Sequence, residues 1–268
     1  MKIRSGFSIY VLVVALLVSN ACIIARAAME GSFDRTLNVS GSVDLDVTTG
    51  SGKIRVRTGD NGAVHIYGLI RAHDDLRARA EDKVRYLQSN PPIEQSGNII
   101  RIGRIPDYQY RNVSISYELV VPADTRLRSK TGSGEQSIEG IKGPAEVGTG
   151  SGNISISSVG VEVTARTGSG RIDLDSINGR VEAHTGSGNI QASRIAGSLK
   201  ADTGSGGITA VLAAAGDVDL STGSGKLEAS GIKGSLHART GSGHITAGGE
   251  PSGEWNVHAS SGGITLHL

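Results

Sequence analysis

The chain has 268 residues, 37% of them apolar and 20% charged, so it can bury a core and lacks the composition of a disordered protein. Its 39 glycines are about twice the usual share, whereas one Trp and two Phe argue against a globule built on aromatic anchors. The near-balanced net charge of +1 gives no indication of a nucleic-acid partner. We therefore expect a thin, aliphatic core.

The first 27 residues have the pattern of a cleaved secretory signal. Lys2 and Arg4 precede an apolar run over 7–24, and small residues follow it. We expect residues 1–27 to be a signal peptide and the mature chain to be exported. Two alternatives remain: a retained membrane anchor, because the run is close to the length that spans a bilayer, and lipidation at Cys22.

Cleavage after Ala27 would change the charge and the redox chemistry of the chain. It removes three basic residues, which leaves 27 − 3 = 24 basic against 26 acidic residues, about two units negative. It also removes Cys22, the only cysteine, so the mature chain could form neither a disulfide nor a thiolate metal site. We expect no nucleic-acid partner, and membrane contact only through an uncleaved signal or a lipid anchor.

Residues 33–130 predict irregular first coils of a β-rich domain. Apolar and polar residues alternate over 37–47, as in a strand with one buried face, and a turn at 49–52 leads to a second short strand at 54–56.

An amphipathic helix is predicted at about 73–90, where apolar side chains recur at helical spacing before Pro91. Two longer strands around Pro106 then predict a hairpin over about 97–121. We expect the helix to pack on the side or the end of the stack, where it would cover unpaired backbone of the last strand. The apolar helix positions are Leu76, Ala80, Val84 and Leu87.

Residues 131–268 consist of a regular repeat that continues the preceding part. The tetrapeptide Thr-Gly-Ser-Gly recurs from Thr131 to Thr240 at steps of 18, 18, 18, 18, 19 and 18 residues, after a first copy at Thr49. Two short alternating stretches separate the copies, and 18 residues are too few for a crossover helix between parallel strands. The repeat therefore predicts an all-β fold, a parallel β-solenoid (β-helix) of about 18-residue coils stacked directly on each other.

Glycines form the predicted corners of the coils, because glycine adopts the left-handed backbone angles of tight corners without strain. The structural corner glycines are Gly132, Gly134, Gly150, Gly152, Gly168, Gly170, Gly186, Gly188, Gly204, Gly206, Gly223, Gly225, Gly241 and Gly243.

Parallel stacking should also align the outward residues of successive coils in columns. Like charges rarely adjoin in the predicted column, which is typical of a solvated face. The column is Glu146, Thr164, Glu182, Lys200, Asp219, His237 and Asn256.

Three stretches resemble the bacterial putative-adhesin family of exported β-strand-repeat domains of unknown function. They are Phe33–Val39, Gly52–Val56 and Tyr117–Pro122, the last of which leads to the corner at Thr131. The likeness spans residues 33–268. It implies an exported parallel β-solenoid, and the family has no catalytic residues to carry over.

We predict no catalytic, metal-binding or cofactor-binding residues. The corners differ from a phosphate loop, since Ile54 and Leu227 stand where Ser or Thr would be required. Ladders of corner hydroxyls raise an ice-binding alternative, which the curvature of a corner disfavours.

Two sets of polar residues are candidates for a cation site. The aspartate pairs 173/175 and 217/219 fall in non-adjacent coils, which disfavours a shared cation or a catalytic carboxylate pair. His184, His237 and His258 are assigned to different columns, which disfavours a histidine metal site.

The predicted function is a non-enzymatic, exported structural or interaction module of undefined ligand, located in the periplasm, cell envelope or extracellular space. Its expected partner is an unknown macromolecule of the cell envelope or surface. The alternative is a carbohydrate-active β-helix enzyme acting on envelope polysaccharide, which the near absence of insertions between the coils from 131 to 240 disfavours.

A possible interaction surface is predicted in 70–124, the segment that breaks the repeat and holds Tyr86, Tyr108, Tyr110 and Tyr117. The other interpretation of this segment is that it only caps the stack.

Overall fold

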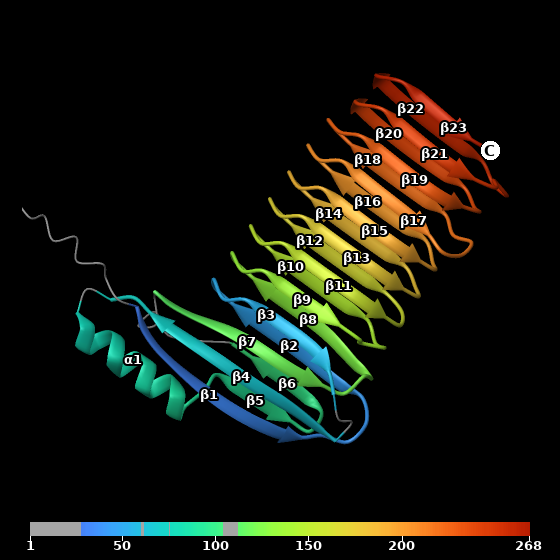
Figure 1. Ribbon diagram of the computed structural model, residues 1–268. Helices are drawn as coiled ribbons and strands as arrows, with labels where there is room; N and C mark the ends of the chain where they lie inside the picture. The colour runs from blue at the N-terminus through green and yellow to red at the C-terminus, as the bar shows by residue number, and fades with distance from the viewer. Residues whose placement is uncertain (1–27, 60–61, 75, 104–111) are drawn as a thin grey trace, which may run out of the picture.

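The computed structural model describes residues 28–59, 62–74, 76–103 and 112–268, so the predicted signal at 1–27 lies outside the described residues. The described chain forms the predicted all-β parallel solenoid, a rod of stacked coils with a helix at its N-terminal end (Figure 1). In chain order the elements are β1 (Met29–Asn38), β2 (Val43–Thr49), β3 (Ile54–Thr58), β4 (Ala63–Ala72), α1 (Arg77–Ser89), β5 (Ile93–Ser96), β6 (Ile99–Ile102), β7 (Val113–Val121), β8 (Thr125–Thr131), β9 (Gln136–Glu139), β10 (Ala145–Thr149), β11 (Ile154–Val159), β12 (Val163–Thr167), β13 (Ile172–Ile177), β14 (Val181–Thr185), β15 (Ile190–Ile195), β16 (Leu199–Thr203), β17 (Ile208–Leu212), β18 (Val218–Thr222), β19 (Leu227–Ile232), β20 (Leu236–Ser242), β21 (Ile245–Gly249), β22 (Trp255–Ser261) and β23 (Ile264–His267).

Two sheets face each other along the rod. Over the described residues, sheet A has 12 strands in the order β1-β4-β7-β3-β9-β11-β13-β15-β17-β19-β21-β23. Sheet B has 11 strands in the order β22-β20-β18-β16-β14-β12-β10-β8-β2-β6-β5. From β8 to β21 each coil adds one strand to sheet B, turns through a Thr-Gly-Ser-Gly corner, and adds the next strand to sheet A. The last coil, β22 and β23, turns through Ala259-Ser260-Ser261-Gly262. Neighbouring strands of successive coils are parallel, as in β12 with β14 and β13 with β15.

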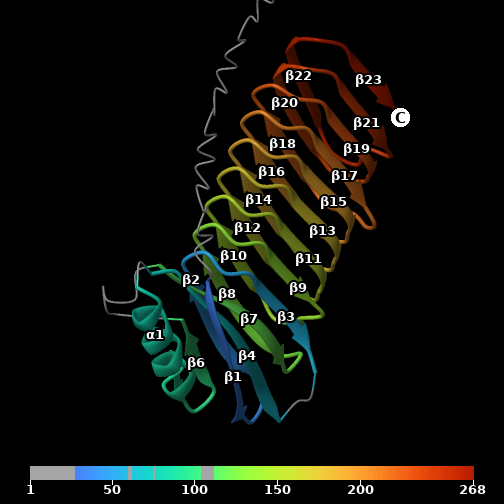
Figure 2. The ribbon, with the colours of Figure 1, turned by 60° about the vertical axis from the view of Figure 1, so that its left-hand side comes forward.

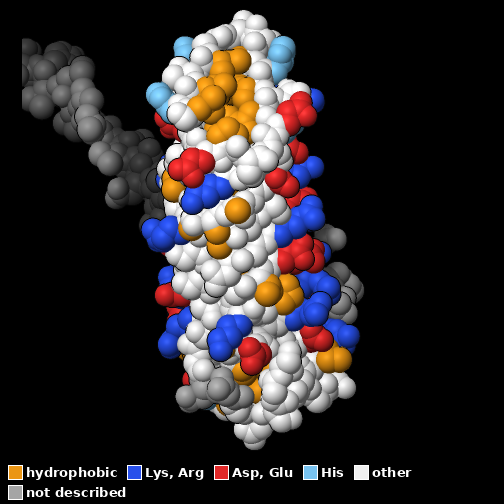
Figure 3. Space-filling view, turned by 90° about the vertical axis from the view of Figure 1, so that its right-hand side faces the viewer, with side chains coloured by type: hydrophobic (Ala, Val, Ile, Leu, Met, Phe, Trp, Pro, Cys, Tyr) orange, Lys and Arg blue, Asp and Glu red, His pale blue; other side chains and the backbone are white. Residues whose placement is uncertain are grey.

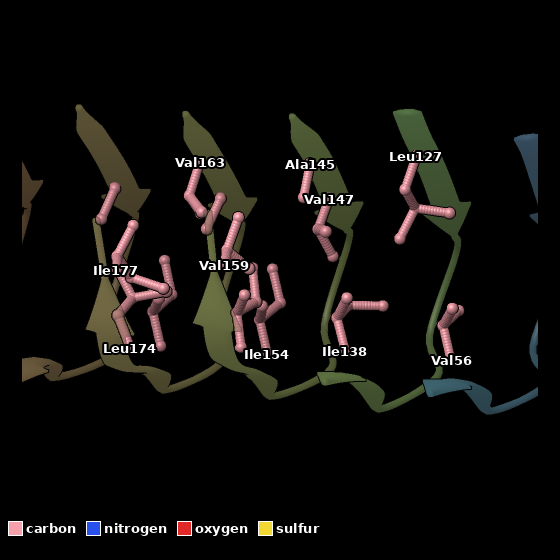
Figure 4. Close-up of a cluster of buried hydrophobic side chains, with 14 of the residues drawn as sticks. Val56, Leu127, Ile138, Ala145, Val147, Ile154, Val159, Val163, Leu174 and Ile177 are labelled. Atoms are coloured by element: carbon pink, nitrogen blue, oxygen red, sulfur yellow. The ribbon is translucent and has the colours of Figure 1, made fainter. Parts of the chain in front are cut away.

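Aliphatic side chains fill the narrow space between the two sheets (Figure 4). Ile154, Ile172 and Ile190 pair in register on adjacent strands of sheet A, and each is 0% exposed. Burying one such side chain contributes about 1.5–3 kcal/mol. The stacked aliphatic column that the repeat predicts is therefore confirmed.

The threonine that begins each corner is buried, with 0–8% of its surface exposed. The hydroxyl of Thr167 donates to the Gly152 carbonyl of the preceding coil at 2.9 Å and accepts from the Gly170 N–H of its own corner at 3.1 Å. A buried hydrogen bond of this kind contributes about 1 kcal/mol, and it ties each coil to the one before. The threonine ladder behind the ice-binding alternative thus lies inside the fold and not on its surface.

Close approach of successive coils, and not a left-handed backbone, explains the corner glycines. None of the predicted corner glycines has a positive φ, which corrects the reason given from the sequence. A Cβ on Gly168 would lie 2.4 Å from the Gly150 oxygen, and one on Gly170 would lie 1.8 Å from the Gly152 oxygen. A side chain at either position would force the two coils apart.

Left-handed backbone occurs instead at one residue near the end of the sheet A strand. Ser158 has φ 57°, and the corresponding residues of neighbouring coils, Ser176 and Arg194, have φ 56° and 53°. This residue adds one position between two core side chains, so that Ile156 and Val159 are both buried despite their odd spacing. The same position is occupied by glycine at Gly140 and Gly231.

The first coil lies next to residues far away in the sequence. Thr49 of β2 pairs with Thr131 of β8, and Ile54 of β3 pairs with Gln136 of β9. The coil of β2 and β3 therefore stacks directly on the first regular coil. The described strands that lie between β3 and β8 in the sequence, β4 to β7, lie on the N-terminal side of this coil. The expectation of earlier coils holds for β2 and β3, but β1 pairs antiparallel with β4 at the edge of sheet A.

The predicted hairpin over 97–121 is wrong. β6 lies in sheet B beside β2, whereas β7 lies in sheet A between β4 and β3. The hairpin of this region is formed by β5 and β6, which join at Gly97 with φ 61°. Long-range pairing with β2 and β3 separates the two strands that the sequence places together.

The predicted helix is present as α1, the one helix among the described residues, at the N-terminal end of the rod (Figure 2). Ala80, Val84 and Leu87 are buried as expected, but Leu76 precedes the helix and is 54% exposed. A Cβ on Gly31 of β1 would lie 2.4 Å from Val84 Cγ1, so only glycine allows the helix to approach so closely. Gly31 lies two residues before the buried Phe33, so both face the same side of β1, toward the core. Helix α1 therefore covers the core-facing side of sheet A, beyond the last strand of sheet B.

Candidate binding face

The outer face of sheet B is a two-column array of polar and charged side chains. Strand pairing confirms the predicted column from Glu146 to Asn256. A second column, two residues further along each strand, contains Lys130, Gly148, Arg166, His184, Asp202, Ser221, Arg239 and His258. In the first column Lys200 lies between Glu182 and Asp219, an alternation of charge that stabilises parallel neighbours and is typical of a solvated face.

A shallow hollow of about 650 Å³ lies in this face, over β6, β2, β8, β10 and β12. Its charged lining residues, here called the charged hollow, are Asp44, Asp46, Arg101, Arg126, Arg128, Glu146, Glu162 and Arg166.

Ion pairs between neighbouring strands organise the charged hollow. Arg126 Nε lies 3.3 Å from Asp44 Oδ1, and Arg128 Nε lies 3.3 Å from Glu146 Oε2. These side chains are 44–66% exposed, so each pair contributes only about 0–1 kcal/mol to stability. Because these ion pairs contribute so little to stability, each charged side chain can replace its internal partner with a charged group of a ligand at little cost to the fold.

The outer face of sheet A differs in chemistry. Around β13 this face contains a smaller hollow of about 230 Å³, bordered by the short polar side chains of Ser155, Ser157 and Ser193. Asp175 is bound by Arg194, whereas Asp173 Oδ1 has no hydrogen-bond partner and its nearest cation, Arg171 Nε, is 4.0 Å away. Partial burial raises the pKa of Asp173, against the smaller opposing effect of Arg171.

The two aspartate pairs singled out from the sequence do not come together. Asp173 and Asp175 lie in sheet A, whereas Asp219 lies in sheet B and Asp217 directly precedes its strand. Asp217 Oδ1 accepts bonds from the Ser235 amide at 2.9 Å and the Ser235 hydroxyl at 2.5 Å, which lower its pKa. Asp217 therefore binds the next coil.

The described residues contain no group of three or more His, Cys, Asp or Glu that could hold a metal ion. The assignment of the histidines to separate columns needs one correction, because His184 and His258 share the second column of sheet B. Three coils separate them, so they do not form a site.

The four tyrosines of the predicted interaction surface do not form one surface. Tyr117 is 1% exposed and packs edge-on against Phe33, with ring centroids 6.3 Å apart. Its burial raises the pKa of the phenol, and its hydroxyl has no hydrogen-bond partner. Tyr86 is 53% exposed on α1, whereas Tyr108 and Tyr110 lie outside the described residues. Tyr117 belongs to the core, so the prediction for it is wrong.

The arginines of the charged hollow were missed from the sequence. Arg126 and Arg128 lie on the strand that precedes the first regular corner, and Arg101 reaches the same face from β6. Extending the outward column backward from Glu146 by one coil would have found Arg128. Arg101 carries no such signal, because its strand joins sheet B by long-range pairing.

Across the parts of the chain that the structure describes, no helix is both long enough and apolar enough to cross a membrane. No curated protein matches the sequence.

Three solved structures resemble the fold. A protein described as a putative adhesin from Parabacteroides distasonis is 11% identical, with a TM-score of 0.54 over 88% of this chain and 97% of that chain. A putative adhesin from Bacteroides fragilis is 14% identical, with a TM-score of 0.39 over 88% of this chain and 97% of its own. A putative cell adhesion protein from Clostridium sporogenes is 11% identical, with a TM-score of 0.25 over 89% of this chain and 99% of its own. The first of these shows a shared fold.

The family model described as Toastrack DUF4097 matches residues 111–267, which is more than half of the chain. The match covers β7 and all the regular coils. Together with the fold shared with the Parabacteroides distasonis structure, this match confirms the resemblance to a family of β-strand-repeat domains of unknown function. The chain therefore belongs to the Toastrack DUF4097 family.

Proposed function

We propose that this protein is an exported, non-enzymatic interaction scaffold that uses the charged hollow of sheet B to bind a macromolecule of the cell envelope or surface. The observation that carries the proposal is the concentration of paired, exposed arginines and carboxylates in one hollow of an otherwise regular rod. A hollow with both charge signs suits a polar polymer, because each of its charges can replace an internal pair with a ligand contact.

The rigid support of the hollow favours binding. Its side chains project from strands β2, β8, β10 and β12, which are fixed in register by continuous parallel pairing. A backbone already fixed in this way loses little conformational entropy when a ligand binds, so weak individual contacts can add up along the face. The adhesin descriptions of the structural neighbours agree with a surface role, and export itself rests on the sequence of residues 1–27.

Binding of purified protein to isolated envelope polysaccharide, measured with and without added salt, tests the proposal. The triple variant Arg126→Ala/Arg128→Ala/Arg166→Ala should bind the polysaccharide at least tenfold more weakly than the wild type. Added salt should weaken binding by the wild type, because it screens exposed charges. The matched control Arg171→Ala/Arg194→Ala/Lys226→Ala removes the same charge from residues in, or directly before, strands of sheet A, and it should bind like the wild type.

Equal binding by both triple variants would contradict the assignment of the hollow. Release of reducing ends from the polysaccharide would instead support the carbohydrate-active alternative. Export is tested by the mass of the protein recovered outside the cytoplasm, which should lack residues 1–27.

A further inference from the structure

The two ends of the rod differ in how they end their sheets. At the N-terminal end, α1 packs on β1, and charged residues such as Glu30 and Asp34 lie along the edge strand. At the C-terminal end, β22 and β23 each have a single neighbour in their sheets among the described strands. Their other edges present free backbone donors and acceptors, the arrangement to which another strand adds.

The core is also open at the C-terminal end. Ile264 is 45% exposed and Leu266 is 42% exposed, whereas the residues they stack on, Ile245 and Ala247, are each 1% exposed. Trp255, Val257 and Ala259 of β22 are only partly buried as well. Figure 3 shows a hydrophobic patch at this end of the rod.

Lys, Arg, Asp and Glu side chains are absent from the same coil. Residues 255–268 contain no Lys, Arg, Asp or Glu, whereas every regular coil before them carries at least one charged side chain in its strands. Charged residues, Pro and bulges are the usual means of preventing strand edges from pairing. The terminal coil contains no Pro and no Lys, Arg, Asp or Glu.

We propose that two copies of this chain associate through their C-terminal coils in a two-fold symmetric, end-to-end dimer. β22 and β23 run in opposite directions on opposite sheets, because one follows the other around a single coil. A two-fold axis perpendicular to the rod therefore places each edge strand beside an antiparallel edge strand of the second copy. Both edges pair and both open cores are covered in one contact, which a single partner peptide would not achieve.

The lack of charge favours a second copy over a different partner. In a two-fold contact every residue near the axis meets its own equivalent, so any Lys, Arg, Asp or Glu there would face a like charge. The polar side chains of the terminal coil are instead His, Ser, Thr and Asn.

Sedimentation equilibrium on protein purified from cells that express the full chain tests this dimer. The wild type should sediment as a dimer that dissociates on dilution. Val257→Lys and Leu266→Lys place a charge in the exposed end and should weaken association at least tenfold. The matched controls Asn256→Lys and Thr265→Lys carry the same charge on outward positions of the same strands and should still dimerise.

A second measurement remains informative if the lysine variants unfold. Spin labels on Thr265→Cys should give a short distance between copies, whereas labels on Ser137→Cys, in β9 and seven strands from β23 in sheet A, should give a long distance or none. A monomeric wild type, a filament, or a long distance at Thr265 would overturn the proposal. So would a chain that stays monomeric alone and is covered at this end only by a different protein.

Discussion

The corner glycines show how one atom decides the spacing of the coils. Gly168 donates its N–H to the Gly150 oxygen at 3.0 Å, a contact that brings the backbones of two coils together. The sequence identifies these glycines through their period, but it suggests the wrong cause. Left-handed angles occur at Ser158, Ser176 and Arg194, where no glycine marks them. Close contact between coils depends on the register of the stack, which a single corner cannot reveal.

Gly168→Ala should destabilise the protein, because the new Cβ would lie 2.4 Å from a backbone oxygen that cannot move alone. We expect a loss of about 1–3 kcal/mol in the free energy of unfolding, measured by urea denaturation. Gly50→Ala is the matched control, since Gly50 has the same place in the first coil and nothing lies within 4 Å of its Cβ position. A comparable loss in both variants would refute the close-contact explanation.

Two aspartates should respond to pH in opposite ways. The raised pKa of Asp173 means that its ionised form destabilises the fold, a cost present at pH 7 and absent once pH falls below about 4. The lowered pKa of Asp217 means that its ionised form stabilises the fold at pH 7, and this contribution is lost as pH falls through the folded pKa. Asp173→Asn should therefore raise the melting temperature at pH 7, and Asp217→Asn should lower it.

The difference between Asp173→Asn and the wild type should vanish in melting curves recorded near pH 3, whereas the difference for Asp217→Asn should shrink progressively as pH falls below about 4. If Asp173→Asn is less stable than the wild type at pH 7, the carboxylate must have a stabilising contact other than Arg171, and the prediction fails.

At the scale of elements, the sequence predicts what is local or periodic and misses what is distant. The repeat locates the coils because 18-residue spacing and alternation both report parallel stacking. Helix α1 is found because its buried residues recur every three or four positions. The failed hairpin has the opposite cause, because β6 and β7 are adjacent in sequence but pair with β2 and β3, which lie more than 50 residues earlier. The charged hollow depends on the same distant pairing, so only its later strands could be predicted.

Helix α1 should be separable from the repeat. Val84→Asp and Leu87→Asp together place two charges against β1 and the inner side of sheet A, so α1 should detach. Hydrogen exchange should then show lost protection in α1 and β1 and unchanged protection in β12 to β17. Leu76→Asp is the control, because Leu76 is already exposed and its replacement should leave both regions protected. Lost protection across the whole rod would mean that α1 is required for the stack.

For the whole molecule, stability resides in contacts between neighbouring coils. A single coil buries only a few aliphatic side chains, less than the conformational entropy of ordering its 18 residues requires. The stack is therefore a nearly one-dimensional array, in which the effect of a substitution depends on its distance from the ends.

Ile172→Ala and Ile245→Ala remove the same side chain from equivalent, fully stacked positions of β13 and β21. Each should cost about 2–5 kcal/mol locally. A coil in the middle has folded neighbours on both sides, so Ile172→Ala should lower the urea midpoint of the whole rod. Among the described strands, those of the terminal coil alone lie beyond the coil of β21, so Ile245→Ala should instead release these two coils and leave the main transition close to that of the wild type. Identical midpoint shifts would show a single cooperative unit, and in the end-to-end dimer the Ile245 substitution should also abolish association, because unfolding of the terminal coil removes both strand edges.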